Sequence, residues 1–202
     1  MNGLRSRTGT PADWLFVGLC NPGADYAGTR HNVGAEVVEL LAGRWGQRLK
    51  AGKERALVGE VVVDGVRVAL GVPQTFMNLS GESLRLLAKR YGITDPSRIV
   101  VFHDELDLPT ARVKLKTGGG TAGHNGLKSV QAHLGTADFQ RVRIGIGRPP
   151  GRQQVADYVL KRPGKSERVL LDVAIAVAAD CAERILAVGI DRAMNETNTA
   201  AT

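Results

Sequence analysis

The sequence of 202 residues is long enough for one domain, and it carries 27 lysine and arginine residues against 20 acidic residues, a formal net charge of +7. This balance favours a polyanionic partner such as nucleic acid, although basic residues scattered over a solvated surface give the same count. The two cysteines, Cys20 and Cys181, stand in no metal-binding or redox spacing, which argues against a disulfide framework and a structural zinc site, and we expect both to be buried.

The first elements are a strand, a loop and a helix. Residues 14–19 form an apolar run that ends at an Asn-Pro-Gly turn, residues 21–23, the pattern of a buried strand followed by a loop. From Val33 the apolar residues recur at helical spacing, and Gly46 can serve as a left-handed stop. His31 is therefore expected at or just before a helix N-terminus.

A hairpin and a second helix follow. Residues 57–63 and 66–72 flank Asp64-Gly65, a two-residue turn that permits positive φ and is typical of a hairpin. Residues 80–91 have helical spacing and precede a glycine. Asn78 is thus expected on a loop between a strand and a helix start.

An acidic loop comes next. Residues 99–102 predict a buried strand, and the loop that leaves it contains Asp104, Glu105 and Asp107. Three carboxylates so close together are compatible with a solvated acidic loop or with a magnesium site.

Two further strands have a basic side. Residues 111–116 alternate apolar and basic side chains, the period of a half-buried strand, with Lys114 and Lys116 on the polar face. Residues 141–147 form another strand, which carries Arg143. These cations are suited to holding phosphate, but a solvated strand face has the same pattern.

A glycine-rich segment between these strands leads into a helix. Residues 118–123 match G-x-G-x-x-G, but a dinucleotide fingerprint should follow the first strand of a fold, and the P-loop spacing of Lys-Ser or Lys-Thr is missing. We therefore do not expect a dinucleotide site. The free N–H groups of such a turn can still hold an anion at a helix N-terminus.

The last predicted elements are helical. A Pro/Gly-rich loop, residues 148–151, precedes a short helix, and residues 166–188 form a long amphipathic one. Asp172 and Asp180 interrupt the most apolar stretch, 169–190, so it falls short of the roughly 18 apolar residues of a membrane span.

Alternating strands and helices without a linker or repeat predict a single-domain, three-layer α/β sandwich with a mixed, mostly parallel twisted sheet flanked by helices. We place this domain at residues 14–190. Residues 1–13 hold no apolar stretch of a secretory signal and are expected to be a disordered extension. Residues 191–202 are expected to be a polar, disordered tail.

Polar residues at the ends of these elements are the candidate site. Asn21, His31, Asn78 and Asp104 follow strands or precede helices, and such loops converge beyond the carboxyl ends of the strands of an open sheet. A neutral imidazole can remove a proton from water, an aspartate can orient it, and amides, Asn125 included, can donate to an oxyanion. The set therefore fits hydrolysis of an ester.

Each of these residues alone has a more ordinary explanation. A single histidine before a helix is more often structural, and an asparagine there is more often a helix cap. Neither a G-x-S-x-G elbow nor an H-E-x-x-H pair occurs, so serine hydrolase and zinc protease chemistry lack support. Only the combination favours catalysis.

Three motifs resemble those of bacterial peptidyl-tRNA hydrolases and occur in the order of that family. They are Gly-Leu-Cys-Asn-Pro-Gly and Thr-Arg-His-Asn-Val-Gly within 18–34, Thr-Phe-Met-Asn-Leu-Ser-Gly at 75–81, and His-Asp-Glu-Leu-Asp-Leu-Pro and Gly-His-Asn-Gly-Leu within 103–127. The resemblance spans residues 15–190. Cys20 stands where another small residue is usual, and Ala111 stands where glycine is common.

The resemblance implies an esterase that releases the peptide from peptidyl-tRNA and so recycles tRNA, with no cofactor or metal. His31 would be the base that activates water and Asp104 its orienting partner. Asn21, Asn78 and Asn125 would position the substrate and stabilise the oxyanion.

The resemblance also implies a tRNA-binding surface that contacts the acceptor stem, the 5′ phosphate and the CCA end by shape and charge. Its expected residues are Tyr26, Phe76, Met77, Asn78, Lys114, Lys116, His124, Asn125 and Arg143. A cytoplasmic monomer without membrane contact is implied as well. The alternative is a non-catalytic RNA-binding protein on the same scaffold, which would not need to retain all the candidate catalytic residues.

Overall fold

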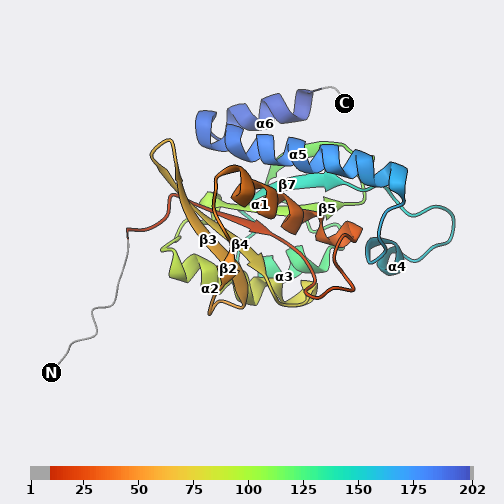
Figure 1. Ribbon diagram of the computed structural model, residues 1–202, viewed down its shortest axis with the longest axis horizontal. Helices are drawn as coiled ribbons and strands as arrows, with labels where there is room; N and C mark the ends of the chain where they lie inside the picture. The colour runs from red at the N-terminus through yellow and green to blue at the C-terminus, as the bar shows by residue number, and fades with distance from the viewer. Residues whose placement is uncertain (1–9, 201–202) are drawn as a thin grey trace.

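A mixed seven-stranded sheet in the order β2-β3-β4-β1-β5-β7-β6 runs through the computed structural model, which describes residues 10–200 (Figure 1). The strands are β1 (Trp14–Gly18), β2 (Lys50–Ala51), β3 (Ala56–Val63), β4 (Val66–Pro73), β5 (Ile99–Glu105), β6 (Val113–Thr117) and β7 (Gln140–Gly145). The central strands β4, β1, β5 and β7 are parallel, whereas β3 and β6 run in the opposite direction. The expected mixed sheet is confirmed.

Helices cover both faces of the sheet. They are α1 (Val33–Arg44), α2 (Ser80–Arg90), α3 (Asn125–Leu134), α4 (Val155–Val159), α5 (Lys165–Val188) and α6 (Ile190–Thr199), with the 3₁₀ turns η1 (Arg30–Asn32), η2 (Met77–Leu79) and η3 (Pro96–Arg98). Side chains alternate along the strands: Phe16 and Phe102 pack with α1 and α5, while Leu15 and Val101 pack with α2 and α3. The three-layer sandwich is thereby confirmed.

The hairpin and both cysteines behave as the sequence predicts. Asp64 and Gly65 have φ of 48° and 85°, the positive values of a two-residue hairpin turn. Cys20 and Cys181 are buried free thiols. Burial, with a smaller effect of Glu39, raises the pKa of Cys20 to about 12, so this thiol stays protonated.

Two glycines allow the first helix to approach the carboxyl ends of β1 and β5. A Cβ atom on Gly34 would lie 2.1 Å from the carbonyl oxygen of Phe102, and one on Gly18 would lie 2.2 Å from that of Gly34. No side chain fits either gap. The close contact brings η1, which carries His31, next to the end of β5, which carries Asp104.

Strand β5 is longer than predicted, because His103, Asp104 and Glu105 belong to it and not to the following loop. Parallel pairing with β7 continues as far as Glu105 opposite Gly145. These polar residues can be buried in a strand because their side chains find partners there, as shown below.

The expected disorder of the C-terminal tail is wrong for residues 191–199, which form most of α6. The Asn198 carboxamide pairs with the backbone N–H and C=O of Leu115 on β6, at 2.9 Å each. Glu196 accepts hydrogen bonds from Arg184 of α5. Ala193 is buried in the core and Met194 packs against it, so a narrow apolar face and polar contacts together hold this helix.

Part of the expected N-terminal extension is also ordered. Ala12 is buried and its N–H bonds to the carbonyl of Tyr91, while the Asp13 N–H bonds to that of Arg67. Residues 1–9 lie outside the described residues. No helix within 10–200 combines the length and the apolar character that crossing a bilayer requires.

Candidate active site

A cleft of about 600 Å³ opens beyond the carboxyl ends of β1 and β5. It is lined by most of the residues that the sequence predicted, from four separate segments of the chain. These are Asn21, Tyr26, His31, Phe76, Met77, Asn78, Asp104, His124 and Asn125. The expected convergence of the polar residues on one place is thus what the structure contains.

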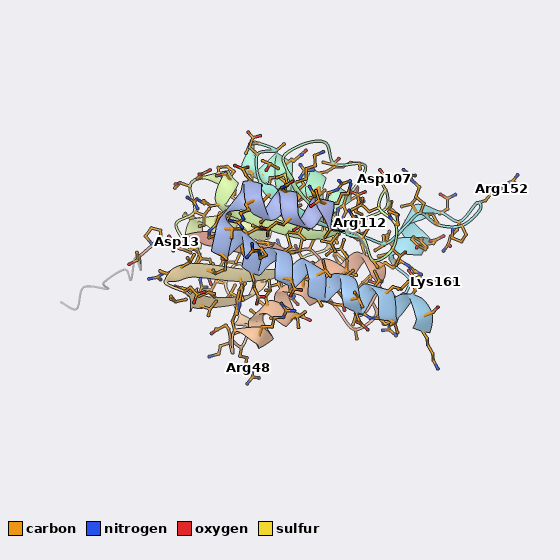
Figure 2. All side chains as sticks on the ribbon, turned by 90° about the horizontal axis from the view of Figure 1, so that it is seen from above. Asp13, Arg48, Asp107, Arg112, Arg152 and Lys161 are labelled. Carbon is orange, nitrogen blue, oxygen red and sulfur yellow. The ribbon has the colours of Figure 1, made fainter. Side chains whose placement is uncertain are left out.

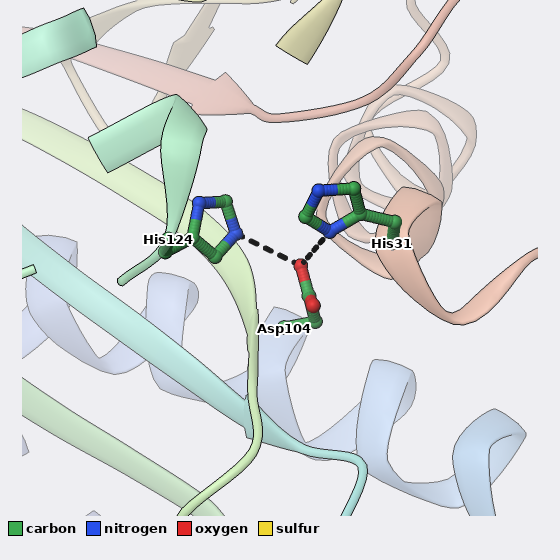
Figure 3. A group of neighbouring side chains, drawn as sticks. All are labelled: His31, Asp104 and His124. Carbon is green, nitrogen blue, oxygen red and sulfur yellow. Dashed lines mark hydrogen bonds and ion pairs between the residues drawn. The ribbon is translucent and has the colours of Figure 1, made fainter. Parts of the chain in front are cut away.

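Two histidines point at one carboxylate oxygen in this cleft (Figure 3). Nδ1 of His31 lies 2.8 Å from Oδ1 of Asp104, and Nε2 of His124 lies 2.9 Å from the same oxygen. Asp104 is 3% exposed, whereas the side chain of His31 is 12% exposed and lines the cleft. His31 is therefore the histidine of this pair whose other nitrogen is free to act.

The hydrogen bonds fix which nitrogen of each ring carries the hydrogen. Nδ1 of His124 caps α3 by accepting from the N–H groups of Gly126 and Leu127, so its hydrogen is on Nε2 and is donated to Asp104. Asp104, an acceptor when ionised, likewise takes the Nδ1–H of His31. The Nε2 lone pair of His31 remains, on the far side of the ring from Asp104 (Figure 3).

The charges of the site follow from these contacts. Burial alone would raise the pKa of the Asp104 carboxyl, but His31 and His124 outweigh it and hold this pKa well below its usual range. Burial alone would lower the pKa of His31, but the charge and hydrogen bond of Asp104 outweigh it and raise this pKa above its ordinary 6.5. Asp104 is thus an anion that favours a protonated His31.

A third histidine lies beneath the site. His103 is 1% exposed, and its Nδ1–H donates to the carbonyl of Asp104 at 2.7 Å. Burial, with the nearby His124 and Arg141, lowers the pKa of His103 to about 3, so this ring stays neutral. Its contact with the Asp104 backbone helps to fix the carboxylate without adding charge.

Carboxamides surround the histidine on the other side. Oδ1 of Asn21 accepts from the backbone N–H of Met77 at 2.8 Å, which links the first and second motifs. The side chain of Asn32 bonds to both the N–H and the C=O of Asn21. Asn78 and Asn125 are exposed at the cleft, and neither side chain bonds to another described residue. These amides are therefore available to a ligand.

The His31, Asp104 and His124 ligand atoms lie within 4.8 Å of one another, which raises the question of a metal. Their donor chemistry does not fit one well. A metal at Nε2 of His124 would need that nitrogen without its hydrogen, while Nδ1 is already occupied as a helix cap. The protonation pattern suits hydrogen bonding between these three side chains.

Comparison with known proteins identifies the family. The sequence model of the family described as Peptidyl-tRNA hydrolase matches residues 15–202. The chain belongs to the peptidyl-tRNA hydrolase family. It is 50% identical over 191 residues to a peptidyl-tRNA hydrolase of Frankia alni, covering 93% of this chain and 96% of that one. For a Geobacillus kaustophilus peptidyl-tRNA hydrolase the identity is 48%, with coverage of 91% and 98%.

Solved structures agree. The crystal structure of peptidyl-tRNA hydrolase from Acinetobacter baumannii matches with a TM-score of 0.87 and 40% identity, covering 95% of this chain and 98% of that one. The α/β sandwich is therefore the fold of peptidyl-tRNA hydrolases.

The basic residues predicted for this peptidyl-tRNA hydrolase family member lie beside the cleft and do not line it. Lys114 of β6 pairs in register with Arg143 of β7, and Lys116 pairs with Arg141. The Lys116 side chain is exposed, whereas Arg143 donates to Glu105 at 3.0 Å and is half-buried. The cations thus form one strip along the sheet edge, with Arg143 partly neutralised.

Sequence reasoning missed two parts of the site. Arg141 does not face solvent: it holds the glycine-rich loop by donating to the carbonyls of Gly119 and Gly120 at 2.6 and 2.7 Å. One wall of the cleft comes from α4 and the residue after it. Its members are Val155, Ala156, Val159 and Leu160. Only their apolar character in a short helix after a Pro/Gly-rich loop hinted at this wall.

Proposed function

We propose that this protein hydrolyses the ester that joins a peptide, or an N-blocked aminoacyl group, to the 3′-terminal ribose of tRNA, with His31 as the general base. The observation that carries the proposal is the orientation of His31. Its Nδ1 is held by a buried aspartate, which leaves Nε2 to take a proton in a cleft lined by amides. The family supports peptidyl-tRNA as the substrate.

The side chains already described supply the groups that the reaction needs. Nε2 of His31 takes a proton as water adds to the ester carbonyl, and Asp104 stabilises the imidazolium. The amides of Asn21, Asn78 and Asn125 hold the substrate and donate to the oxyanion. When the bond between the carbonyl carbon and the ribose oxygen breaks, the imidazolium returns its proton to that oxygen, releasing the peptide acid and tRNA.

The remaining predicted residues have roles in binding. Tyr26 and Phe76 are in edge contact, with ring centroids 6.3 Å apart, and with Met77 they offer an apolar floor to the 3′ end or the peptide. Lys114, Lys116 and Arg143 are the proposed contacts to the acceptor stem and the 5′ phosphate. Such contacts read charge and A-form shape, as an enzyme that accepts many tRNAs requires.

His124 has a different proposed role from the direct substrate contact that the resemblance suggested. Both of its ring nitrogens are already engaged, one by the α3 backbone and one by Asp104. We assign it to positioning Asp104. We also propose that the protein acts as a monomer in the cytoplasm, as the resemblance to this family implies.

The proposal is tested by His31→Ala, because removing the ring removes the base but not the basic strip. Turnover of N-acetyl-aminoacyl-tRNA should fall by on the order of 10²–10⁴-fold, with tRNA affinity nearly unchanged. His133→Ala, an exposed histidine on α3 away from the cleft, is the control and should keep full activity. Normal turnover by His31→Ala would end the assignment, and tRNA binding without turnover by the unmodified protein would support the RNA-binding alternative.

A further inference from the structure

Helix α4 forms one wall of the cleft and is a short element between two loops. It is only five residues long, and it follows the Pro/Gly-rich loop and precedes the short linker to α5. In Figure 2, Arg152 and Lys161 on either side of it lie at the end of the molecule far from Asp13. A single helical turn has little stability of its own, so contacts with other elements must set its position.

Arg30, the neighbour of His31, reaches into this region from the first motif. Its Nη1 donates to the carbonyls of Tyr158 and Lys161 at 3.1 and 3.0 Å, and its guanidinium lies 4.1 Å from the centre of the Tyr158 ring. Its Nε and Nη2 form a two-pronged pair with Glu167 in the first turn of α5, at 2.6 and 2.5 Å. The side chain is 8% exposed and does not line the cleft.

Arg162 makes the reverse connection. It leaves the linker after α4 and donates to the carbonyls of Ala27 and Ala24 at 2.8 and 2.9 Å. Those carbonyls belong to the turn that carries Tyr26. Two arginines therefore connect the same two segments in opposite directions. Each arginine extends from one segment and binds backbone carbonyls of the other segment.

We propose that Arg30 and Arg162 are positioning residues that fasten α4 to the segment bearing Tyr26 and His31, and thereby set the width of the substrate cleft. Neither guanidinium reaches the cleft, and neither touches Asp104, so they act through the wall and not on the base. The inference rests on the proposed function only in taking this cleft as the substrate site.

This arrangement predicts a particular kinetic effect. A loosened α4 wall weakens substrate binding but leaves the His31–Asp104 geometry intact, so KM should rise while kcat and its pH dependence stay the same. Since Arg162 is exposed, Arg162→Ala should fold normally and raise KM about fivefold. Arg162→Lys keeps the charge without the fork and should recover only part of the loss.

The experiment compares Arg162→Ala, Arg162→Lys and Glu167→Gln in the full chain, with Arg168→Gln as the matched control. Arg168 binds Glu36 of α1 and Asp172 of its own helix. The change Arg168→Gln therefore removes a similar ion pair without affecting a contact of α4. Steady-state kinetics on N-acetyl-aminoacyl-tRNA and amide hydrogen exchange of residues 155–164 are measured for each variant. Hydrogen exchange needs no substrate, so it tests the fastening even if the proposed reaction fails.

Faster exchange in 155–164 together with a higher KM, in both Arg162→Ala and Glu167→Gln but not in Arg168→Gln, is the expected result. Unchanged exchange in that segment would overturn the inference. So would a fall in kcat or a displaced pH profile at unchanged KM, because that would place the two arginines in control of the base.

Discussion

Asp104 accepts two imidazole N–H groups on a single buried oxygen, and the two histidines are not equivalent partners. His124 is locked by its second bond to the α3 backbone, whereas the second nitrogen of His31 faces the cleft. The site therefore has one base, although its sequence offers several histidines. The carboxylate determines the properties of that base.

The pH dependence of the reaction should reveal this control. His31 acts when neutral, and its pKa is raised, so kcat/KM should fall as pH drops through a value above 6.5. In Asp104→Asn both contributions that raise this pKa are lost and burial remains, so the acidic limb should move below 6.5. The pH profile of kcat/KM, recorded for the unmodified protein and for Asp104→Asn, gives the position of the acidic limb in each. In Asp104→Asn, kcat should also fall by on the order of 10²–10⁴-fold. An acidic limb that stays in place or moves up would show that Asp104 does not set the pKa of His31.

His124 can be tested without disturbing the helix that it caps. In His124→Asn, the amide oxygen replaces Nδ1 as the acceptor for Gly126, but nothing replaces the Nε2–H that Asp104 accepts. The free energy of unfolding should fall by roughly 1–3 kcal/mol, because the buried Asp104 carboxylate loses one of its two donors, while kcat should fall by on the order of tenfold. Because less of the Asp104 charge is then offset, the acidic limb should move to higher pH. Unchanged kcat would show that His124 caps α3 but does not position Asp104 for the reaction.

At the scale of whole elements, local sequence was enough wherever an apolar pattern was regular. Helices α1 and α2 and the β3–β4 hairpin lie where helical spacing and the Asp-Gly turn predicted them. The sequence did not predict helix α6, because its apolar face is narrow, with Ala193 buried, and its order also needs the contacts of Asn198 with the β6 backbone and of Arg184 with Glu196. Such contacts join residues that no short stretch of sequence relates.

The residues of the site likewise fall into those that local sequence indicates and those that depend on contacts between distant segments. Asn21, His31, Asn78 and Asp104 stand at or near strand ends and helix starts, so chain position and chemistry indicated them. The α4 wall and the carbonyl contacts of Arg30 and Arg141 depend on where distant loops meet, and only coordinates give them. His103–Glu105 were assigned to a loop because a polar sequence does not reveal that its partners lie in the core.

The connection between β5 and β6 carries strain that can be removed. Ala111 has a φ of 73°, a left-handed conformation that costs a non-glycine residue about 1–2 kcal/mol. Glycine loses more chain entropy on folding, which offsets part of this gain. Ala111→Gly should therefore stabilise the protein by a net of roughly 0.5–1 kcal/mol. Urea unfolding measures this difference. Ala137→Gly, in a connection where φ is not positive, should destabilise instead, and equal effects of the two changes would refute the strain.

At the scale of the whole molecule, the sheet order places exposed lysines at opposite edges of the sheet. Strands β6 and β2 are the opposite edges of the sheet, so Lys116 and Lys50 are both exposed but lie on different sides of the protein. Each contributes one unit to the net charge of +7. Their replacement therefore distinguishes a local phosphate contact from general attraction to a polyanion.

Lys116→Gln should weaken tRNA binding and flatten its salt dependence, because one phosphate contact contributes about 0.7–0.9 to the slope of log K against log salt. The chemical step should not change, since Lys116 does not line the cleft. Lys50→Gln removes the same charge from the far edge and should leave the slope nearly intact. Fluorescence titration of tRNA at several salt concentrations, with single-turnover hydrolysis alongside, gives both quantities. Equal slopes for the two variants would mean that the strip on β6 and β7 attracts tRNA only through net charge, and the proposed clamp on the 5′ phosphate would have to be given up.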